Sequence, residues 1–232
     1  MTYAALSILA ALLGRAPPRA LRALGAALGL LAGSVLRIRR PLVEEAMRQA
    51  GVGDVGPAAR AMYDELGRGL AELLSAAGSI AARERLLAEV ALEERALLAL
   101  DAALERGPVV LFASHTGNWE LVAGAAARLL AARGRRLQVV AKRIHERGVD
   151  AFVRRLRSAL GVQLIAPDGA YAAARRALSA GDVVGMPIDQ VPDRIGHGTP
   201  VPFLGADALV DRAPATLAWR ARATVLVVAA SR

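Results

Sequence analysis

The sequence has no cysteine, and aromatic residues make up only 3% of it. Without a thiol there is no disulfide, no thiolate metal ligand and no cysteine nucleophile, so any nucleophile must be oxygen or nitrogen. The scarcity of aromatic rings leaves few platforms on which single-stranded nucleic acid stacks, and no zinc finger or other nucleic-acid signature is present. We therefore expect no nucleic-acid partner.

Lysine is almost absent as well, since Lys142 is the only one, and the formal charge of +9 rests on arginine. This charge suits an anionic lipid surface or a phosphorylated substrate, although a GC-rich genome also produces arginine-rich proteins. The three histidines, His115, His145 and His197, lack the spacing of metal ligands. We predict contact with a membrane or with phosphate, and no metal.

No N-terminal apolar run reaches the ~20 residues that a membrane-spanning helix needs. Residues 2–14 and 24–36 are apolar, and the arginine cluster at residues 37–40 follows them. In a secretory signal peptide the basic residues come first, which argues against that interpretation. We predict that residues 1–40 form membrane-associating helices with their arginines at the cytoplasmic headgroups, or alternatively a buried helical hairpin.

Residues 41–232 have the pattern of an α/β domain, in which short apolar runs alternate with helical segments after about residue 107. An amphipathic helix is predicted over residues 57–77, where apolar positions recur at helical spacing. The predicted strands are residues 109–113, 137–141, 162–165, 183–188 and 224–229, and the predicted helices are residues 119–132, 149–160, 170–180 and 213–222. This alternation predicts a largely parallel central sheet flanked by helices.

Two further features concern the end of the chain. The Gly/Pro-rich residues 193–205 are expected to form a loop over the site. The final strand runs almost into residue 232, where a domain of this type normally has further elements. We therefore expect the domain to be incomplete at its C-terminus.

The strongest chemical signal follows the first predicted strand, which delivers His115 to its carboxyl end, where α/β sheets bind ligands. A tight turn at Gly117 and Asn118 and a helix starting near Trp119 then place Glu120 in the first helical turn. From there Glu120 is expected to reach back to the imidazole, fixing its tautomer and leaving the other nitrogen basic. We predict His115 as a general base oriented by Glu120.

A serine nucleophile is not favoured, because Ser114 precedes the histidine and no Gly-x-Ser-x-Gly elbow is present. Asp189 ends a predicted strand at the same edge as His115, so it is expected to line the site, holding an arginine or touching the substrate that accepts a group. Arg143 and Arg157 are candidates for binding phosphate through their guanidinium forks.

The segment His-Thr-Gly-Asn-Trp-Glu at residues 115–120 resembles the catalytic His-x4-Glu/Asp motif of the lipid A biosynthesis acyltransferases of the lauroyl and myristoyl transferase type. Residues 187–190 are similar to the family's Pro-Asp-Gln-Asp stretch, although Val191 departs from it. Residues 198–205 resemble its Gly-Val-x-Val-Pro-Phe-Phe-Gly run, and Arg143 and Arg157 lie where it has basic residues. The family is part of the lysophospholipid acyltransferase-like superfamily.

This resemblance implies transfer of a fatty acyl chain from acyl carrier protein or acyl-CoA onto a hydroxyl of a lipid A precursor or related glycolipid, without a cofactor. It implies a location at the cytoplasmic face of the bacterial inner membrane. Two alternatives remain: a glycerophosphate or lysophospholipid acyltransferase, and a non-catalytic module that binds anionic membranes. The residues predicted to bind substrate are Asn118, Arg143, Arg157, Asp189 and Gln190.

Overall fold

The strands of the computed structural model, which describes residues 1–192 and 195–231, form two separate sheets. The larger sheet has five strands in the order β3-β2-β4-β1-β7, and every pair of neighbours is parallel. Its strands are β1 (Val109–Ala113), β2 (Leu137–Val140), β3 (Gln163–Ile165), β4 (Val183–Pro187) and β7 (Thr224–Val228). The predicted α/β fold with a parallel central sheet flanked by helices is therefore confirmed.

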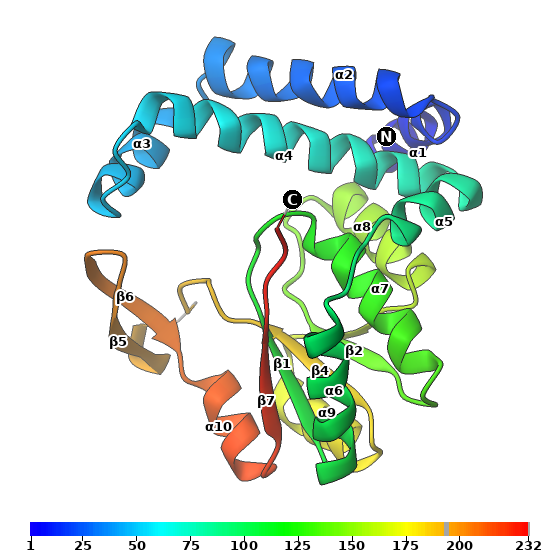
Figure 1. Cartoon of the computed structure of the whole chain (residues 1–232), viewed down its shortest axis with the longest axis vertical. Helices are drawn as coiled ribbons and strands as arrows, with labels where there is room; N and C mark the ends of the chain where they lie inside the picture. Colours follow the sequence, from blue (N-terminus) through cyan, green and yellow to red (C-terminus); the bar gives the residue numbers. More distant parts are fainter. Residues whose placement is uncertain (193–194, 232) are drawn as a thin grey trace.

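Helices cover both faces of this sheet (Figure 1). One face packs against α5 (Ile80–Ala88), α6 (Glu94–Arg106), α7 (Trp119–Ala131) and α8 (Arg147–Ala159), and the other against α9 (Ala170–Ser179) and α10 (Ala213–Arg220). Alternate residues of a strand point to opposite faces. Accordingly, Val109 and Leu111 belong to the first core, whereas Val110 belongs to the second.

A layer of helices lies across one end of the α/β domain, above the carboxyl end of β1 in Figure 1. We call it the helical layer. It consists of α1 (Thr2–Leu13), α2 (Pro18–Leu30), the π-helix η1 (Leu31–Val35), α3 (Arg40–Gln49) and α4 (Val55–Gly78). The amphipathic helix predicted over residues 57–77 is α4.

Glycines bring α2 and α4 into backbone contact along much of their length. A Cβ atom added at Gly67 of α4 would overlap the carbonyl oxygen of Gly25, and one at Gly29 would overlap the carbonyl oxygen of Tyr63. Larger side chains are therefore excluded from these glycine positions.

Other contacts join residues 1–40 to the α/β domain. The ring of Tyr3 packs edge-on against Phe152 of α8, with centroids 6.5 Å apart, and Arg155 Nη1 donates to Tyr3 Oη over 2.8 Å.

Arg40, one of the arginines predicted to lie at headgroups, is instead buried, and its Nη1 donates to the carbonyl oxygen of Gly33 over 2.9 Å. Arg37 and Arg39 are exposed at a bend where both have positive φ.

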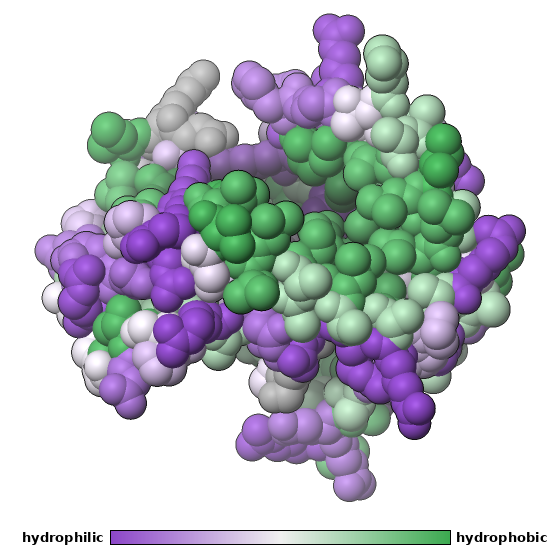
Figure 2. Space-filling model, turned by 90° about the horizontal axis from the view of Figure 1, so that it is seen from above, coloured by the Kyte–Doolittle hydropathy of each residue, from purple (hydrophilic) through white to green (hydrophobic). Residues whose placement is uncertain are grey.

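The outer face of the helical layer is apolar. Figure 2, which looks down on this end of the molecule, shows hydrophobic residues gathered over a broad area with polar residues around it. The large apolar side chains exposed on α1, α2, η1 and the bend that follows include Ile8, Leu12, Leu30, Leu31, Val35, Leu36 and Ile38. Among the described residues no single helix passes a length and hydropathy test for a span; one pair bent by 88°, Pro18–Val35 with Arg40–Gln49, passes it.

The expected loop over residues 193–205 is largely wrong. Residues 193 and 194 lie outside the described residues, but a short 3-10 helix η2 (Ile195–His197) and an antiparallel hairpin follow, formed by β5 (Gly198–Phe203) and β6 (Ala206–Asp211). The turn at Leu204 and Gly205 has positive φ at both residues. Prolines at 200 and 202 hide the strand pattern, but a two-stranded hairpin tolerates proline because both its strands are edges.

Candidate active site

Two neighbouring strands deliver the central residues of the site to one edge of the sheet. β1 ends at Ala113 and β4 at Pro187, and the register pairs these two residues directly. His115 follows the end of β1 by two residues, and Asp189 follows the end of β4 by two residues. These equal offsets from paired strand ends place the two side chains next to each other.

His115 and Asp189 are joined by two hydrogen bonds. The backbone N–H of His115 donates to Asp189 Oδ2 over 2.6 Å, and His115 Nδ1 lies 2.7 Å from Oδ1. An ionised carboxylate only accepts hydrogen bonds, so Nδ1 carries the proton and Nε2 keeps its lone pair. Trp119 packs edge-on against the imidazole, with ring centroids 4.8 Å apart. The ring is therefore held in one tautomer, with Nε2 able to act as a base.

The Asp189 carboxyl is kept ionised by its contact with His115. Partial burial acts to raise its pKa, but hydrogen bonds from the His115 amide and ring, together with electrostatic attraction to the ring when it is protonated, outweigh burial and hold the pKa below its ordinary value. Because the folded-state pKa is lowered, the contribution of Asp189 to stability is present above about pH 4 and is lost as the pH falls through the lowered pKa.

Glu120 lies in the first turn of α7, as predicted, but its contact differs from the predicted one. Among the described residues, the carboxylate bonded to the imidazole is that of Asp189, and Glu120 binds Arg157 of α8 instead. Arg157 Nε lies 3.0 Å from both carboxylate oxygens, and Nη2 lies 2.5 Å from Oε1. Glu120 is only 6% exposed, so α7 directs it toward α8, where the guanidinium fork matches the carboxylate.

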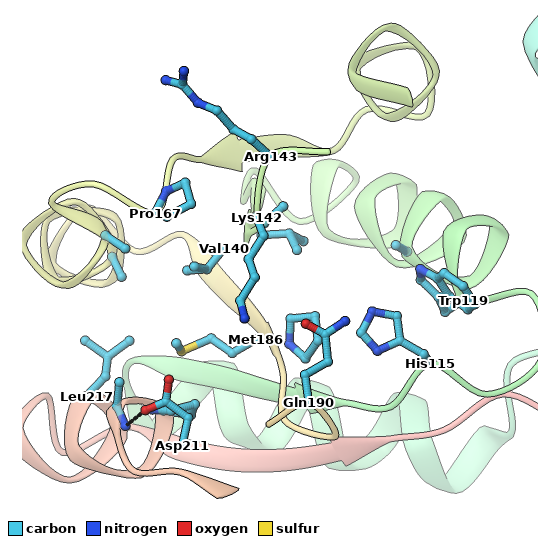
Figure 3. A pocket seen from close by; sticks show the side chains of 18 of the residues that line it. His115, Trp119, Val140, Lys142, Arg143, Pro167, Met186, Gln190, Asp211 and Leu217 are labelled. Carbon is cyan, nitrogen blue, oxygen red and sulfur yellow. Dashed lines mark hydrogen bonds between the residues drawn. The ribbon is translucent and has the colours of Figure 1, made fainter. Parts of the chain in front are cut away.

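A cleft of about 570 Å³ brings together five of the predicted residues. They are His115, Glu120, Arg143, Arg157 and Gln190. Figure 3 shows Gln190 close to His115 and Lys142 pointing into the cleft, whereas the side chain of Arg143 extends away from His115.

Two predicted residues lie outside the lining of this cleft. Asp189 supports His115 from the side, and Asn118 donates from Nδ2 to Glu72 Oε2 of α4 over 2.8 Å. The Asn118 contact crosses from the α/β domain to the helical layer. Asn118 therefore contacts protein where the sequence analysis expected substrate.

Away from His115 the cleft is mainly apolar. It extends between the ends of β2 and β4 and the helices α9 and α10. The apolar residues lining this part include Val139, Val140, Val162, Ala174, Met186 and Leu217. Its shape and lining suit a flexible hydrocarbon chain.

Sequence reasoning missed three residues of the site. Trp119 contacts the imidazole, Lys142 lines the cleft, and Glu72 binds Asn118. Lys142 carried a signal, because it is the only lysine in an arginine-rich chain. Glu72 carried none, since its partner is 46 residues away in another layer.

A histidine bound to a carboxylate at the carboxyl edge of a parallel sheet, facing an apolar cleft, is suited to acid–base chemistry on a largely apolar molecule. Residues 2–232 match the family described as bacterial lipid A biosynthesis acyltransferase. The chain belongs to this family of acyltransferases, as its motifs predicted. A comparison with curated proteins finds no match.

Proposed function

We propose that the protein transfers a fatty acyl chain from a thioester, borne by acyl carrier protein or CoA, onto a hydroxyl of a lipid A precursor or related glycolipid. The observation that carries the proposal is the His115–Asp189 pair at an apolar cleft, in a chain of the lipid A acyltransferase family. A base with its lone pair on Nε2 suits removal of a hydroxyl proton, and the apolar cleft suits an acyl chain.

The proposed reaction uses His115 as the base. The acceptor hydroxyl gives its proton to His115 Nε2 while its oxygen bonds to the thioester carbonyl carbon, and the carbonyl electron pair moves to oxygen. When this tetrahedral intermediate collapses, the carbon–sulfur bond breaks and the imidazolium returns the proton to the departing thiolate. Asp189 stabilises the imidazolium between these steps, because its carboxylate is bound to Nδ1.

In this scheme Glu120 acts on Arg157. It holds the guanidinium at the cleft through Nε and Nη2, and Nη1 makes no hydrogen bond to any described residue. A guanidinium held in this way is suited to binding a phosphate, either on the pantetheine arm of the donor or on the glycolipid headgroup. Arg143 at the rim would supply a second cation, and Gln190 beside His115 would contact the acceptor.

The helical layer would hold the enzyme at the cytoplasmic leaflet of the inner membrane. Its outer face exposes large apolar side chains, including Ile8, Leu12 and Val35, and Arg37 and Arg39 are exposed beside them. Apolar insertion together with attraction between arginine and anionic headgroups is the usual means of peripheral binding. In this arrangement residues 1–40 serve the membrane and residues 41–232 the chemistry.

The test is an assay with lauroyl acyl carrier protein or lauroyl-CoA and a detergent-dispersed lipid A precursor, in which thiol release and lipid mass are followed together. We expect the lipid to gain one acyl chain per thiol released, and His115→Ala to abolish both. His145→Ala is the matched control, because His145 is exposed and does not line the cleft.

Two outcomes would overturn the proposal. Acylation of lysophospholipid with no reaction of the lipid A precursor would indicate the alternative acceptor class. Binding to anionic vesicles with no thiol release from either donor would indicate the non-catalytic membrane module.

A further inference from the structure

Asn118 follows the loop that carries His115, and its side chain is used in an unusual way. Asparagine at the start of a helix ordinarily accepts a hydrogen bond from the first turn. Asn118 precedes α7, but its side chain makes no such bond. It reaches across to Glu72 on α4 instead, with Nδ2 2.8 Å from Oε2.

The chemistry of Glu72 determines how this amide is oriented. A carboxylate accepts hydrogen bonds, so the NH₂ group of Asn118 must face it. Asn118 Oδ1 is then buried, and no hydrogen bond from a described residue reaches it. Both side chains are partly buried, so the bond is shielded from competition by water.

The same loop is held at two other points. His115 binds Asp189, and the hydroxyl of Thr116 accepts a hydrogen bond from the backbone N–H of Ala230 over 3.2 Å. Asp189 and Ala230 both belong to the α/β domain. The Glu72 bond links this loop to the helical layer, and it adjoins Trp119, which packs on the imidazole.

We propose that Glu72 is a positioning residue that sets the place of the His115 loop through its hydrogen bond to Asn118. The inference rests on the proposed function, since it concerns the alignment of His115 with the acyl donor. α4 thereby contributes to the active site without touching substrate. A displacement of about 1 Å in a reacting group can cost 10²-fold in rate, so one such bond matters to catalysis.

The test reverses the direction of the bond. Asn118→Asp places a carboxylate against Glu72, and we expect kcat for lauroyl transfer to fall roughly 10²-fold, with the donor KM changing by less than about threefold. Glu72→Gln keeps an acceptor oxygen and should change kcat by less than about threefold. In the double variant the Gln NH₂ donates to the Asp carboxylate, so kcat should recover at least about tenfold relative to Asn118→Asp.

Glu65→Gln is the matched control, because Glu65 lies two turns earlier on the same face of α4 and is exposed. A folded double variant no more active than Asn118→Asp would overturn the proposal, as would unchanged kcat in Asn118→Asp. Recovery of the melting temperature without recovery of kcat would indicate a structural role only, and would overturn it too.

If Asn118→Asp does not fold, Glu72→Ala carries the test, with a fall in kcat of about tenfold expected in the folded protein. Unchanged kcat in that variant contradicts the inference. Full activity in His115→Ala would refute the proposed function itself. Loss in His115→Ala with no effect of any change at 72 or 118 would refute only the role of Glu72.

Discussion

The helical layer and the α/β domain differ in how many of their large apolar side chains they bury. In the α/β domain Leu130 and Leu160 are fully buried between helices and sheet. In the helical layer glycines occupy the contact between α2 and α4, and Ile8, Leu12 and Val35 are 64%, 64% and 66% exposed. Exposed apolar side chains cost little free energy when the medium around them is itself apolar, as the interior of a membrane is. This difference supports the proposal that the α/β domain carries the chemistry and the helical layer the attachment to a membrane.

The two regions are nevertheless joined beside the site. Tyr3 packs on α8, the helix that carries Arg157, and Glu72 of α4 binds the loop that carries His115. A change in the helical layer can therefore alter the site as well as the proposed attachment. The following variants separate them.

The largest expected effect is that of His115→Ala on transfer. The ring is the proposed base, so we expect activity to fall by about 10² to 10⁴-fold. The side chain is partly exposed at the sheet edge, so the melting temperature should stay close to that of the unchanged protein. Initial rates of thiol release and thermal unfolding measure the two effects. Near-normal turnover in the folded variant would place the chemistry elsewhere.

Replacing each acid by its amide should separate catalysis from stability within the α/β domain. Asp189→Asn removes the charge that stabilises the imidazolium, so we expect a fall in kcat of at least about 10²-fold. Glu120→Gln leaves Arg157 without its counter-ion, so the free energy of unfolding should drop by about 3 kcal/mol. Denaturant unfolding and initial rates check both. If Glu120→Gln lowered kcat more than Asp189→Asn and left the protein stable, Glu120 and not Asp189 would be the residue that orients His115.

Within the helical layer, two glycines of α4 form a matched pair. Gly67→Ala forces a methyl group into the backbone of α2, and we expect a loss of about 1–3 kcal/mol in the free energy of unfolding. Gly69→Ala meets no atom within 4 Å and should gain about 0.5–1 kcal/mol from helix propensity. Equal effects at the two positions would show that α2 does not pack on α4 in solution.

The smallest expected effect concerns attachment. Changing both Ile8 and Leu12 to serine should weaken binding to anionic vesicles by roughly tenfold, because two side chains no longer insert. Activity on detergent-dispersed acceptor should remain. Trp219→Ser is the control, since Trp219 is 78% exposed on α10, away from the helical layer (Figure 1). Vesicle sedimentation gives the affinities, and equal weakening by both changes would contradict a specific membrane face.

These point variants test attachment better than removal of residues 1–40 would. Because α2 contacts α4 through its glycines, deletion would expose the opposite side of α4. Loss of binding after such a deletion would then not distinguish a missing anchor from a disrupted fold.

Much of the α/β domain was predictable because its elements are specified locally. The five strands of the larger sheet and α7 to α10 lie within two residues of their predicted bounds. Glycines with positive φ, at 107, 134, 161 and 181, come two or three residues before strands β1 to β4, and the helices repeat apolar residues at helical spacing. The hairpin of β5 and β6 was missed because its prolines and glycines mask the alternation of a strand. The backbone contact between α2 and α4 was missed because it depends on glycines 38 or more residues apart.

In the site, too, local features were predictable and contacts between distant residues were not. By itself, the sequence determined that His115 follows a strand, that Gly117 makes the turn with its positive φ, and that Glu120 lies in the first turn of a helix. These are properties of adjacent residues. Only the tertiary structure decided which groups those residues meet, because the strand order sets β4 beside β1 and so brings Asp189 to the imidazole. In the same way, the placement of α8 beside α7 brings Arg157 into hydrogen-bonding contact with Glu120.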